Sequence, residues 1–187
     1  MSDFTQQFIQ DCLKTESKDF GKIRERLEDP QIRATLKFYL EEYIYFAEQL
    51  DVLKKLLFYG KLPQNEDFLF SKEYVSERDD KIHNTSDKNI RLLHAGLGIA
   101  TESAEFLVPL LKHLYQNEML DEVNLAEESL CDLAWYQSIC ADALGKTSFK
   151  EGFDKVVAKL KARYGEKFSD SAAVSRDLEK ERKILES

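Results

Sequence analysis

Two pairs of carboxylates stand at helical spacing in the second half of the chain. Glu102 and Glu105 lie three residues apart in "HAGLGIATESAEFL", and Glu128 and Asp132 lie four residues apart in "NLAEESLCDLAWYQSICADAL". Three or four residues turn an α-helix by about 300° or 400°, so the two members of each pair share a face. The residues around both pairs are mostly apolar. A buried pair of like charges is unfavourable unless a cation or a basic side chain compensates it.

The chemistry that such a set supports is binding of a hard metal ion. Two antiparallel helices joined by a short loop would place one carboxylate pair opposite the other. An all-oxygen cluster of this kind suits Mg²⁺ or Mn²⁺ and not zinc. The simpler alternative is a solvated acidic stripe, because glutamate pairs at this spacing are frequent on exposed helix faces.

Composition favours a mainly helical protein to position these residues. The 187 residues include only seven glycines and three prolines, fewer turn residues than a sheet protein needs. The net charge of −8 argues against nucleic acid as a partner. No apolar run approaches membrane-spanning length, so we expect no membrane association. Cys12, Cys131 and Cys140 are odd in number and widely spaced, which favours reduced thiols and a cytoplasmic location.

The hydrophobic pattern predicts an all-α helical bundle. Residues 1–60 form an N-terminal helical segment that closes at Gly60, and residues 61–87 form a polar connector. We expect residues 88–187 to pack with the N-terminal part as one domain. The expected helices are one near Lys72 to Arg78 in the connector and then four over residues 87 or 88 to 115, 122–144, 148–164 and 171–185.

From about Asn89 onward the sequence resembles the MazG-like all-α nucleoside triphosphate pyrophosphohydrolases. The resemblance rests on E-x-x-E, the loop "LDEVNL", the order "EE…D-L-x-W-Y", the segment "KLKARYGEKF" and the tail "RDLEKERKILE". It implies a bundle in which four acidic residues hold Mg²⁺ and activated water cleaves the α–β bond of a nucleoside triphosphate. The products would be a nucleoside monophosphate and pyrophosphate. The resemblance also implies a homodimer or a higher homo-oligomer.

The resemblance suggests roles for six residues, of which Glu128 lies one position away from the family's metal-binding glutamate but shares a face with Asp132. Two basic residues four apart on the helix at 148–164 are expected to contact the triphosphate, although solvated surface lysine and arginine residues at this spacing are common. Two of the acidic residues, Glu105 and Glu128, are expected to be catalytic. The metal ligands are Glu102, Glu105, Glu128 and Asp132, and the phosphate contacts are Lys159 and Arg163.

Two positions depart from the family pattern. Ser129 stands where the metal-binding glutamate of E-E-L-G-D is expected, and read from Asn124 one residue has been inserted. Val156 replaces the usual asparagine of N-x-x-K-L-x-x-R-Y. The alternative to an active enzyme is therefore a catalytically degenerate binding or scaffold protein that kept the bundle and lost the metal geometry. A third interpretation is a structural helical protein unrelated to nucleotides.

The N-terminal segment shows a weak internal similarity. "DVLKKLLFYGKLPQNED" is loosely similar to "VPLLKHLYQNEMLDE". This similarity suggests a decayed repeat, in which the first copy lacks the acidic pairs and lets one chain build a bundle that smaller proteins assemble from two. Ordinary helix composition is the alternative explanation.

Overall fold

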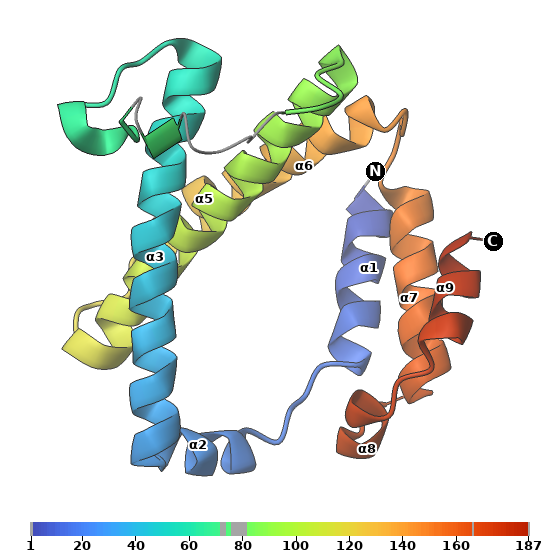
Figure 1. Cartoon of the computed structure of the whole chain (residues 1–187). Coiled ribbons are helices and arrows are strands. Elements are labelled where there is room, and N and C mark those ends of the chain that lie inside the picture. The colour runs from blue at the N-terminus through green and yellow to red at the C-terminus, as the bar shows by residue number, and fades with distance from the viewer. Residues whose placement is uncertain (1, 72–73, 76–81, 166, 187) are drawn as a thin grey trace. The chain divides into compact units, whose positions relative to one another are not determined.

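The computed structural model describes residues 2–71, 74–75, 82–165 and 167–186, and every regular element within them is a helix (Figure 1). The predicted all-α class is therefore confirmed. Among these residues, no helix has the length and apolar character needed to cross a membrane. The elements are α1 (Ser2–Lys14), α2 (Phe20–Glu28), α3 (Pro30–Tyr59), η1 (Glu66–Phe68), α5 (Asp87–Gln116), η2 (Asn124–Ser129), α6 (Leu130–Ala143), α7 (Lys150–Tyr164), α8 (Asp170–Val174) and α9 (Leu178–Glu186).

The chain divides into two compact units at positions that differ from the predicted boundaries. Unit 1 combines residues 1–29 with 147–187, and unit 2 is residues 30–146. The first boundary follows the sequence chemistry, because Pro30 can begin a helix but cannot continue the preceding one. The second follows Gly145, whose φ of 73° ends α6 in the left-handed region. The N-terminal helices are thus shared between the units: α1 and α2 belong to unit 1 and α3 belongs to unit 2.

Unit 2 is built around α5, which packs against both α3 and α6. Helices α3 and α5 are each 30 residues long. The approach of α6 to α5 depends on Gly98, because a Cβ added there would overlap the ring of Tyr136. Each of the two long helices is followed by a left-handed residue, Gly60 (φ 66°) after α3 and Asn117 (φ 58°) after α5.

Unit 1 is built around α7, which contacts α1, α8 and α9. The ring of Phe8 in α1 stacks on Phe153 in α7 with centroids 4.1 Å apart. At the other end of α7, Arg163 binds Glu181 of α9 through two hydrogen bonds. Among the described residues, an aromatic contact thus joins α1 to α7 and an ionic contact joins α9 to α7.

Most of the predicted helix limits are confirmed in the second half of the chain, with two differences. The helix expected over 122–144 contains one turn of π-helix, η2, ahead of α6. The helix expected over 171–185 is two helices, because the Asp177 side chain accepts the Lys180 amide at 3.0 Å and begins α9 anew. The short helix expected near Lys72 to Arg78 lies outside the described residues, apart from residues 74–75. All three cysteines are free; they were expected in the core, but Cys131 is exposed and Cys12 and Cys140 are half-buried.

Candidate functional site

Glu102 is buried between α3 and α5, where a lysine compensates its charge. Lys54 of α3 places its ammonium 3.4 Å from Oε1 of Glu102. The same ammonium donates to Oγ1 of Thr101 at 2.8 Å and lies 3.1 Å from Oδ1 of Asp51. The side chains of Lys54 and Glu102 are only 4% and 9% exposed. The basic partner that a buried carboxylate requires is therefore Lys54.

The ammonium of Lys54 stays charged despite its burial. Burial by itself lowers the pKa of Lys54, but hydrogen bonds to Asp51 and Tyr136 raise it above the usual value. The ammonium also lies 5.0 Å from the centroid of the Tyr136 ring, within cation–π distance. For Asp51, burial raises the pKa, and hydrogen bonds from Lys55 and Lys54 outweigh this effect and lower it. One cation thus joins α3, α5 and α6 at the centre of unit 2.

Glu105 lies at the surface beside this centre. Burial raises the pKa of Glu105, and the nearby carboxylates of Glu102 and Asp51 raise it further. Within the part of the chain that the structure describes, Glu105 forms no salt bridge. The ionised form of Glu105 is consequently under repulsion that Lys54 relieves only in part.

Two cavities meet at Glu105. The first, of about 330 Å³, is also lined by Glu48 and Asp51 of α3. The second, of about 430 Å³, is also lined by Asp121 and Asn124, which precede and begin η2. The carboxylates that gather near the α5 pair thus come from α3 and from the loop before η2. The sequence patterns had predicted that Glu128 and Asp132 would supply these carboxylates.

The residue inserted in the second acidic motif is absorbed by the π-helical turn. Leu130 donates its amide to the carbonyl of Leu125, five residues earlier. Ser129 is 1% exposed and donates to Oδ1 of Asn124 at 3.3 Å, while the Asn124 amide donates to Glu128 at 2.7 Å. Glu128 and Asp132 are both exposed. The buried position in this turn is therefore occupied by a serine, and Glu128 is turned away from it.

These residues do not fit a divalent metal as they stand. Within the described residues, no three His, Cys, Asp or Glu side chains are grouped closely enough to hold a metal ion. Mg²⁺ requires oxygen ligands in near-ideal octahedral geometry. Here the ammonium of Lys54 occupies the space beside Glu102 and repels a second cation. The predicted metal site is therefore not assembled in this arrangement, and the four ligand assignments stay predictions.

The two expected phosphate contacts lie on α7, in unit 1. Nε and Nη2 of Arg163 donate to the two carboxylate oxygens of Glu181 at 2.7 and 2.6 Å. Arg176 adds a further contact to Glu181 at 2.8 Å. A phosphate would have to displace Glu181 to use the same face of the Arg163 guanidinium. Lys159 is half-buried on the same helix, and its phosphate role stays a prediction.

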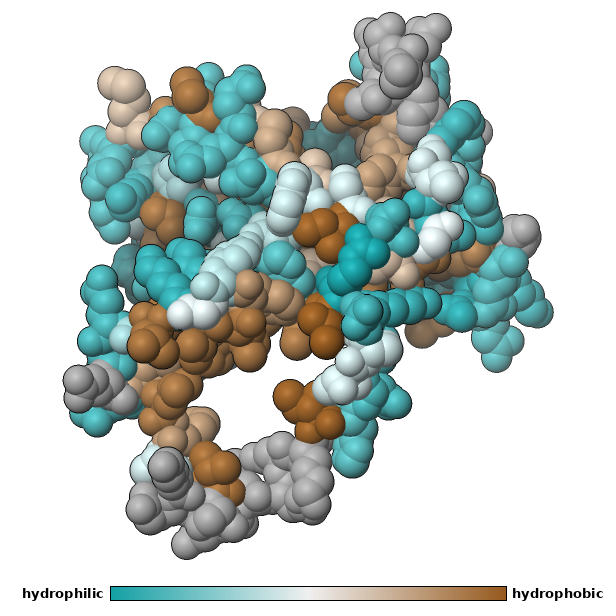
Figure 2. Space-filling view, turned by 90° about the horizontal axis from the view of Figure 1, so that it is seen from above, coloured by the Kyte–Doolittle hydropathy of each residue, from teal (hydrophilic) through white to brown (hydrophobic). Residues whose placement is uncertain are grey.

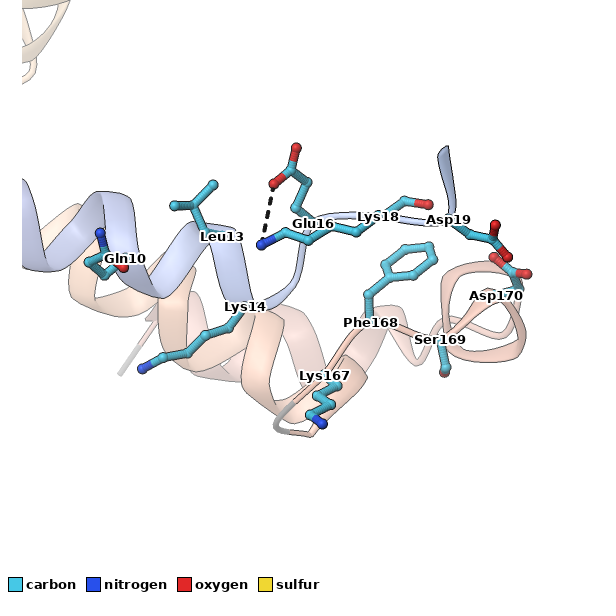
Figure 3. A pocket seen from close by; sticks show the side chains of 11 residues that line it. Gln10, Leu13, Lys14, Glu16, Lys18, Asp19, Lys167, Phe168, Ser169 and Asp170 are labelled. Atoms are coloured by element: carbon cyan, nitrogen blue, oxygen red, sulfur yellow. Dashed lines mark ion pairs between the residues drawn. The ribbon is translucent and has the colours of Figure 1, made fainter. Parts of the chain in front are cut away.

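A separate cavity of about 670 Å³ lies within unit 1 (Figure 3). It is lined by the end of α1, the segment leading to α2 and the start of α8. Its charges are balanced, because three lysines are matched by Glu16, Asp19 and Asp170. Lys18 pairs with Glu16 at a distance of 3.7 Å. Figure 3 shows the side chains of Lys14 and Lys167 directed away from this pair. This cavity therefore offers no concentrated charge for an ionic ligand.

Sequence reasoning missed the residues that organise the centre of unit 2. These are Asp51, Lys54 and Tyr136, which come from α3 and α6. A signal was present in "AEQLDVLKKLL", where Glu48 and Asp51 repeat the three-residue spacing of Glu102 and Glu105 on the segment suspected of being a repeat. The hypothesis of a decayed repeat stays a prediction.

Comparisons with protein-family models, curated proteins and solved structures find no match for this chain. The resemblance to MazG-like enzymes accordingly remains a prediction from the motifs. The structure itself defines the class: an all-α protein in which α3, α5 and α6 surround a lysine–carboxylate centre.

Proposed function

We propose that this chain is a catalytically degenerate MazG-like bundle that serves as a binding or scaffold protein. The observation that supports the proposal is the contact of Lys54 with Glu102 and Asp51. An internal ammonium supplies the positive charge that the buried carboxylate needs, so the folded unit does not require a metal ion. Ser129 in the buried position of η2 supports the same conclusion, because a hydroxyl is a weaker ligand for Mg²⁺ than a carboxylate.

The test is a search for turnover with the purified full-length chain. Nucleoside triphosphates are supplied singly with millimolar Mg²⁺ or Mn²⁺, and pyrophosphate, phosphate and nucleoside monophosphate are quantified separately. We expect pyrophosphate release no faster than that of the Glu105→Gln variant, which serves as the background. Release by the unaltered chain that is at least tenfold faster, and is lost in Glu105→Gln, would overturn the proposal.

A second candidate is the active Mg²⁺-dependent pyrophosphohydrolase, and the state of Glu105 favours it. Burial and, after it, the nearby carboxylates of Glu102 and Asp51 raise the pKa of Glu105. A divalent cation that displaced Lys54 would relieve the repulsion among these carboxylates. In this candidate, nucleotide and metal would enter together and shift the lysine towards phosphate.

Deleting Ser129 separates the two candidates further. The deletion restores the E-E-L-C-D spacing and removes the extra residue of the π-turn. If the inserted residue disables a former enzyme, the deletion variant should release pyrophosphate faster than the unaltered chain. If Glu128 already serves as a ligand, the deletion should abolish activity, as Glu128→Ala should. Circular dichroism must first show that helix content is retained.

A further inference from the structure

Glu42 of α3 is surrounded on the helix surface by aromatic side chains. Residues three and four positions apart are neighbours on an α-helix. All four such neighbours of Glu42 are aromatic, because Phe38 and Tyr39 precede it and Tyr45 and Phe46 follow it. Each of these aromatic side chains is between 55% and 65% exposed, and Glu42 is exposed as well. We name the five residues the Glu42 aromatic patch.

The two aromatic pairs of the patch have the same arrangement. The ring centroids of Phe38 and Tyr39 are 5.3 Å apart at an interplanar angle of 70°, and those of Tyr45 and Phe46 are 5.5 Å apart at 67°. The pairs are seven residues apart, or about 10 Å along the helix axis, with Glu42 at the midpoint. Figure 2 shows hydrophobic side chains, in brown, at the surface of the molecule.

The patch lies on a different side of α3 from the contact with α5. The hydroxyl of Tyr43 donates to the carbonyl of Ala100 in α5 at 2.9 Å, and Ala47 is 3% exposed. Tyr43 and Ala47 follow Glu42 by one and five positions, so they project about 100° and 140° away from it. The contact that holds α3 in unit 2 therefore leaves the five patch residues exposed.

The charges around the patch favour a cationic partner. Among the described residues, Glu42 forms no salt bridge, whereas the adjacent Glu41 pairs with Lys37. Unit 2 contains 12 basic and 20 acidic residues, so it carries the whole net charge of −8. The patch thus presents one carboxylate and four rings on a negatively charged unit, and both kinds of group attract a cation.

We propose that the Glu42 aromatic patch binds an arginine side chain in a basic segment of another protein. A guanidinium pairs with a carboxylate through two parallel hydrogen bonds and also stacks on aromatic faces, whereas the ammonium of lysine is a point charge. A protein segment is the partner because the patch is an open helix surface, on which a small free cation would stay hydrated. The inference rests on the proposed binding function and names the class of partner.

The area of the patch predicts weak and reversible binding. A fully buried aromatic side chain contributes about 150–250 Å². Four rings that are slightly more than half exposed therefore offer about 400 Å². This is half of the roughly 800 Å² that each partner buries in a stable complex. We accordingly expect dissociation constants in the micromolar range or weaker.

The test measures binding of fluorescent peptides to the full chain by anisotropy, without nucleotide or metal. One peptide has four repeats of Gly-Ser-Arg, and the other has lysine in place of arginine. Glu42→Gln removes the charge of the patch, and Glu41→Gln removes the same charge about 100° away. Phe46→Ala removes one ring, and Leu57→Ala is its control at a position that is 62% exposed and outside the patch. Circular dichroism checks that each variant keeps its helix content.

We expect the arginine peptide to bind at least fivefold more tightly than the lysine peptide at about 150 mM salt, which screens charges beyond about 8 Å. Glu42→Gln and Phe46→Ala should each raise the dissociation constant at least fivefold, and the two controls should change it less than twofold. Equal binding of the two peptides, or equal losses in Glu42→Gln and Glu41→Gln, would indicate general attraction to an acidic protein and overturn the proposal.

Absence of peptide binding would also overturn the proposal. If light scattering then gives twice the 21.7 kDa chain mass, and Phe46→Ala halves the measured mass, a second copy occupies the patch instead. Failure of this inference is distinguishable from failure of the proposed function, because the first is measured by peptide binding and the second by pyrophosphate release.

Discussion

At the scale of single residues, Lys54 is the cation that compensates the buried carboxylate of Glu102 in unit 2. Replacing it with methionine keeps much of the volume and removes the charge, which leaves Glu102 buried without its cation. Breaking a buried ion pair in this way costs about 3–5 kcal/mol. We therefore expect Lys54→Met to lower the free energy of unfolding of unit 2 by this order, as measured by urea denaturation monitored at Trp135.

The double variant Lys54→Met with Glu102→Gln is the control for this prediction. It removes both charges of the pair and should recover a substantial part of the lost stability. If Lys54→Met is as stable as the unaltered chain, the buried pair does not organise unit 2. If adding a divalent metal ion restored the stability of Lys54→Met, this would instead show that a divalent cation can take the place of the ammonium.

A second residue-scale prediction concerns Glu105. Its pKa is raised in the folded protein, so its contribution to stability is fully present below its usual pKa of 4.5 and is lost as pH rises through the raised pKa. At neutral pH the charge of Glu105 therefore destabilises unit 2. We expect Glu105→Gln to raise the melting temperature at pH 7, by at most about 2–4 °C because the side chain is largely solvated.

Thermal scans between pH 4 and pH 8 measure this effect. The advantage of Glu105→Gln should shrink as pH approaches 4, because the unaltered side chain then becomes neutral as well. Glu122→Gln, at an exposed position of the same unit, is the matched control and should show no such dependence. A Glu105→Gln variant that melts lower at pH 7 would contradict the proposed repulsion.

At the scale of elements, the packing of α6 on α5 is controlled by the absence of a side chain at Gly98. An alanine there would overlap the Tyr136 ring, which also faces Lys54. Overpacking of this kind costs about 1–3 kcal/mol. The same substitution at Gly96, two residues earlier in α5, meets nothing within 4 Å and should stabilise the helix by about 0.5–1 kcal/mol.

Denaturant unfolding of Gly98→Ala and Gly96→Ala compares the two positions directly. The first variant should unfold at a lower urea concentration than the unaltered chain, and the second at a higher one. Equal midpoints for the two variants would show that α5 and α6 are not in close contact at Gly98.

At the scale of the whole molecule, the two units should respond differently to acid. The two hydrogen bonds from Arg163 hold the pKa of Glu181 at about 2, well below its usual range. The stability that Glu181 gives to unit 1 is therefore present above pH 4.5 and is lost as pH falls towards 2. Unit 2 contains the single tryptophan, Trp135, so fluorescence reports on that unit and circular dichroism reports on both.

In an acid titration from pH 6 to pH 2, we expect helix content to fall before tryptophan fluorescence changes. Glu181→Gln should reduce the separation, because unit 1 then lacks the carboxylate whose protonation weakens it in acid. Coincident transitions that are unaffected by Glu181→Gln would show that the ion pair does not determine the acid stability of unit 1.

How far this fold could be predicted from sequence depended on the distance over which each interaction acts. The limits of α5 and α7 and the shared face of Glu102 and Glu105 follow from local periodicity, and the sequence patterns predicted them. The contact of Lys54 with Glu102 joins residues 48 positions apart. A lysine three residues after Asp51 has the ordinary spacing of a surface ion pair, so nothing local distinguished it.

The second acidic motif shows a different limit. The extra residue at Ser129 was visible in the sequence, and one inserted residue rotates the helix that follows it by about 100°. A helix can absorb an insertion by shifting one flank or by forming a π-turn, and packing against α5 selects between these outcomes. The division into two units was equally inaccessible, because it depends on α1 pairing with α7 and not with the helices that follow it.

The pairing of Phe8 with Phe153 also determines when unit 1 can form during translation. Residues 30–146, which make up unit 2, leave the ribosome as one continuous stretch and can fold as soon as they emerge. Helix α1 is made before unit 2, yet its partner α7 is synthesised more than 130 residues later, a delay on the order of ten seconds at elongation rates of roughly 5–20 residues per second. During that interval the apolar side of α1 lacks the α7 partner that covers it in the folded chain, and unit 1 cannot form until α7 has been synthesised.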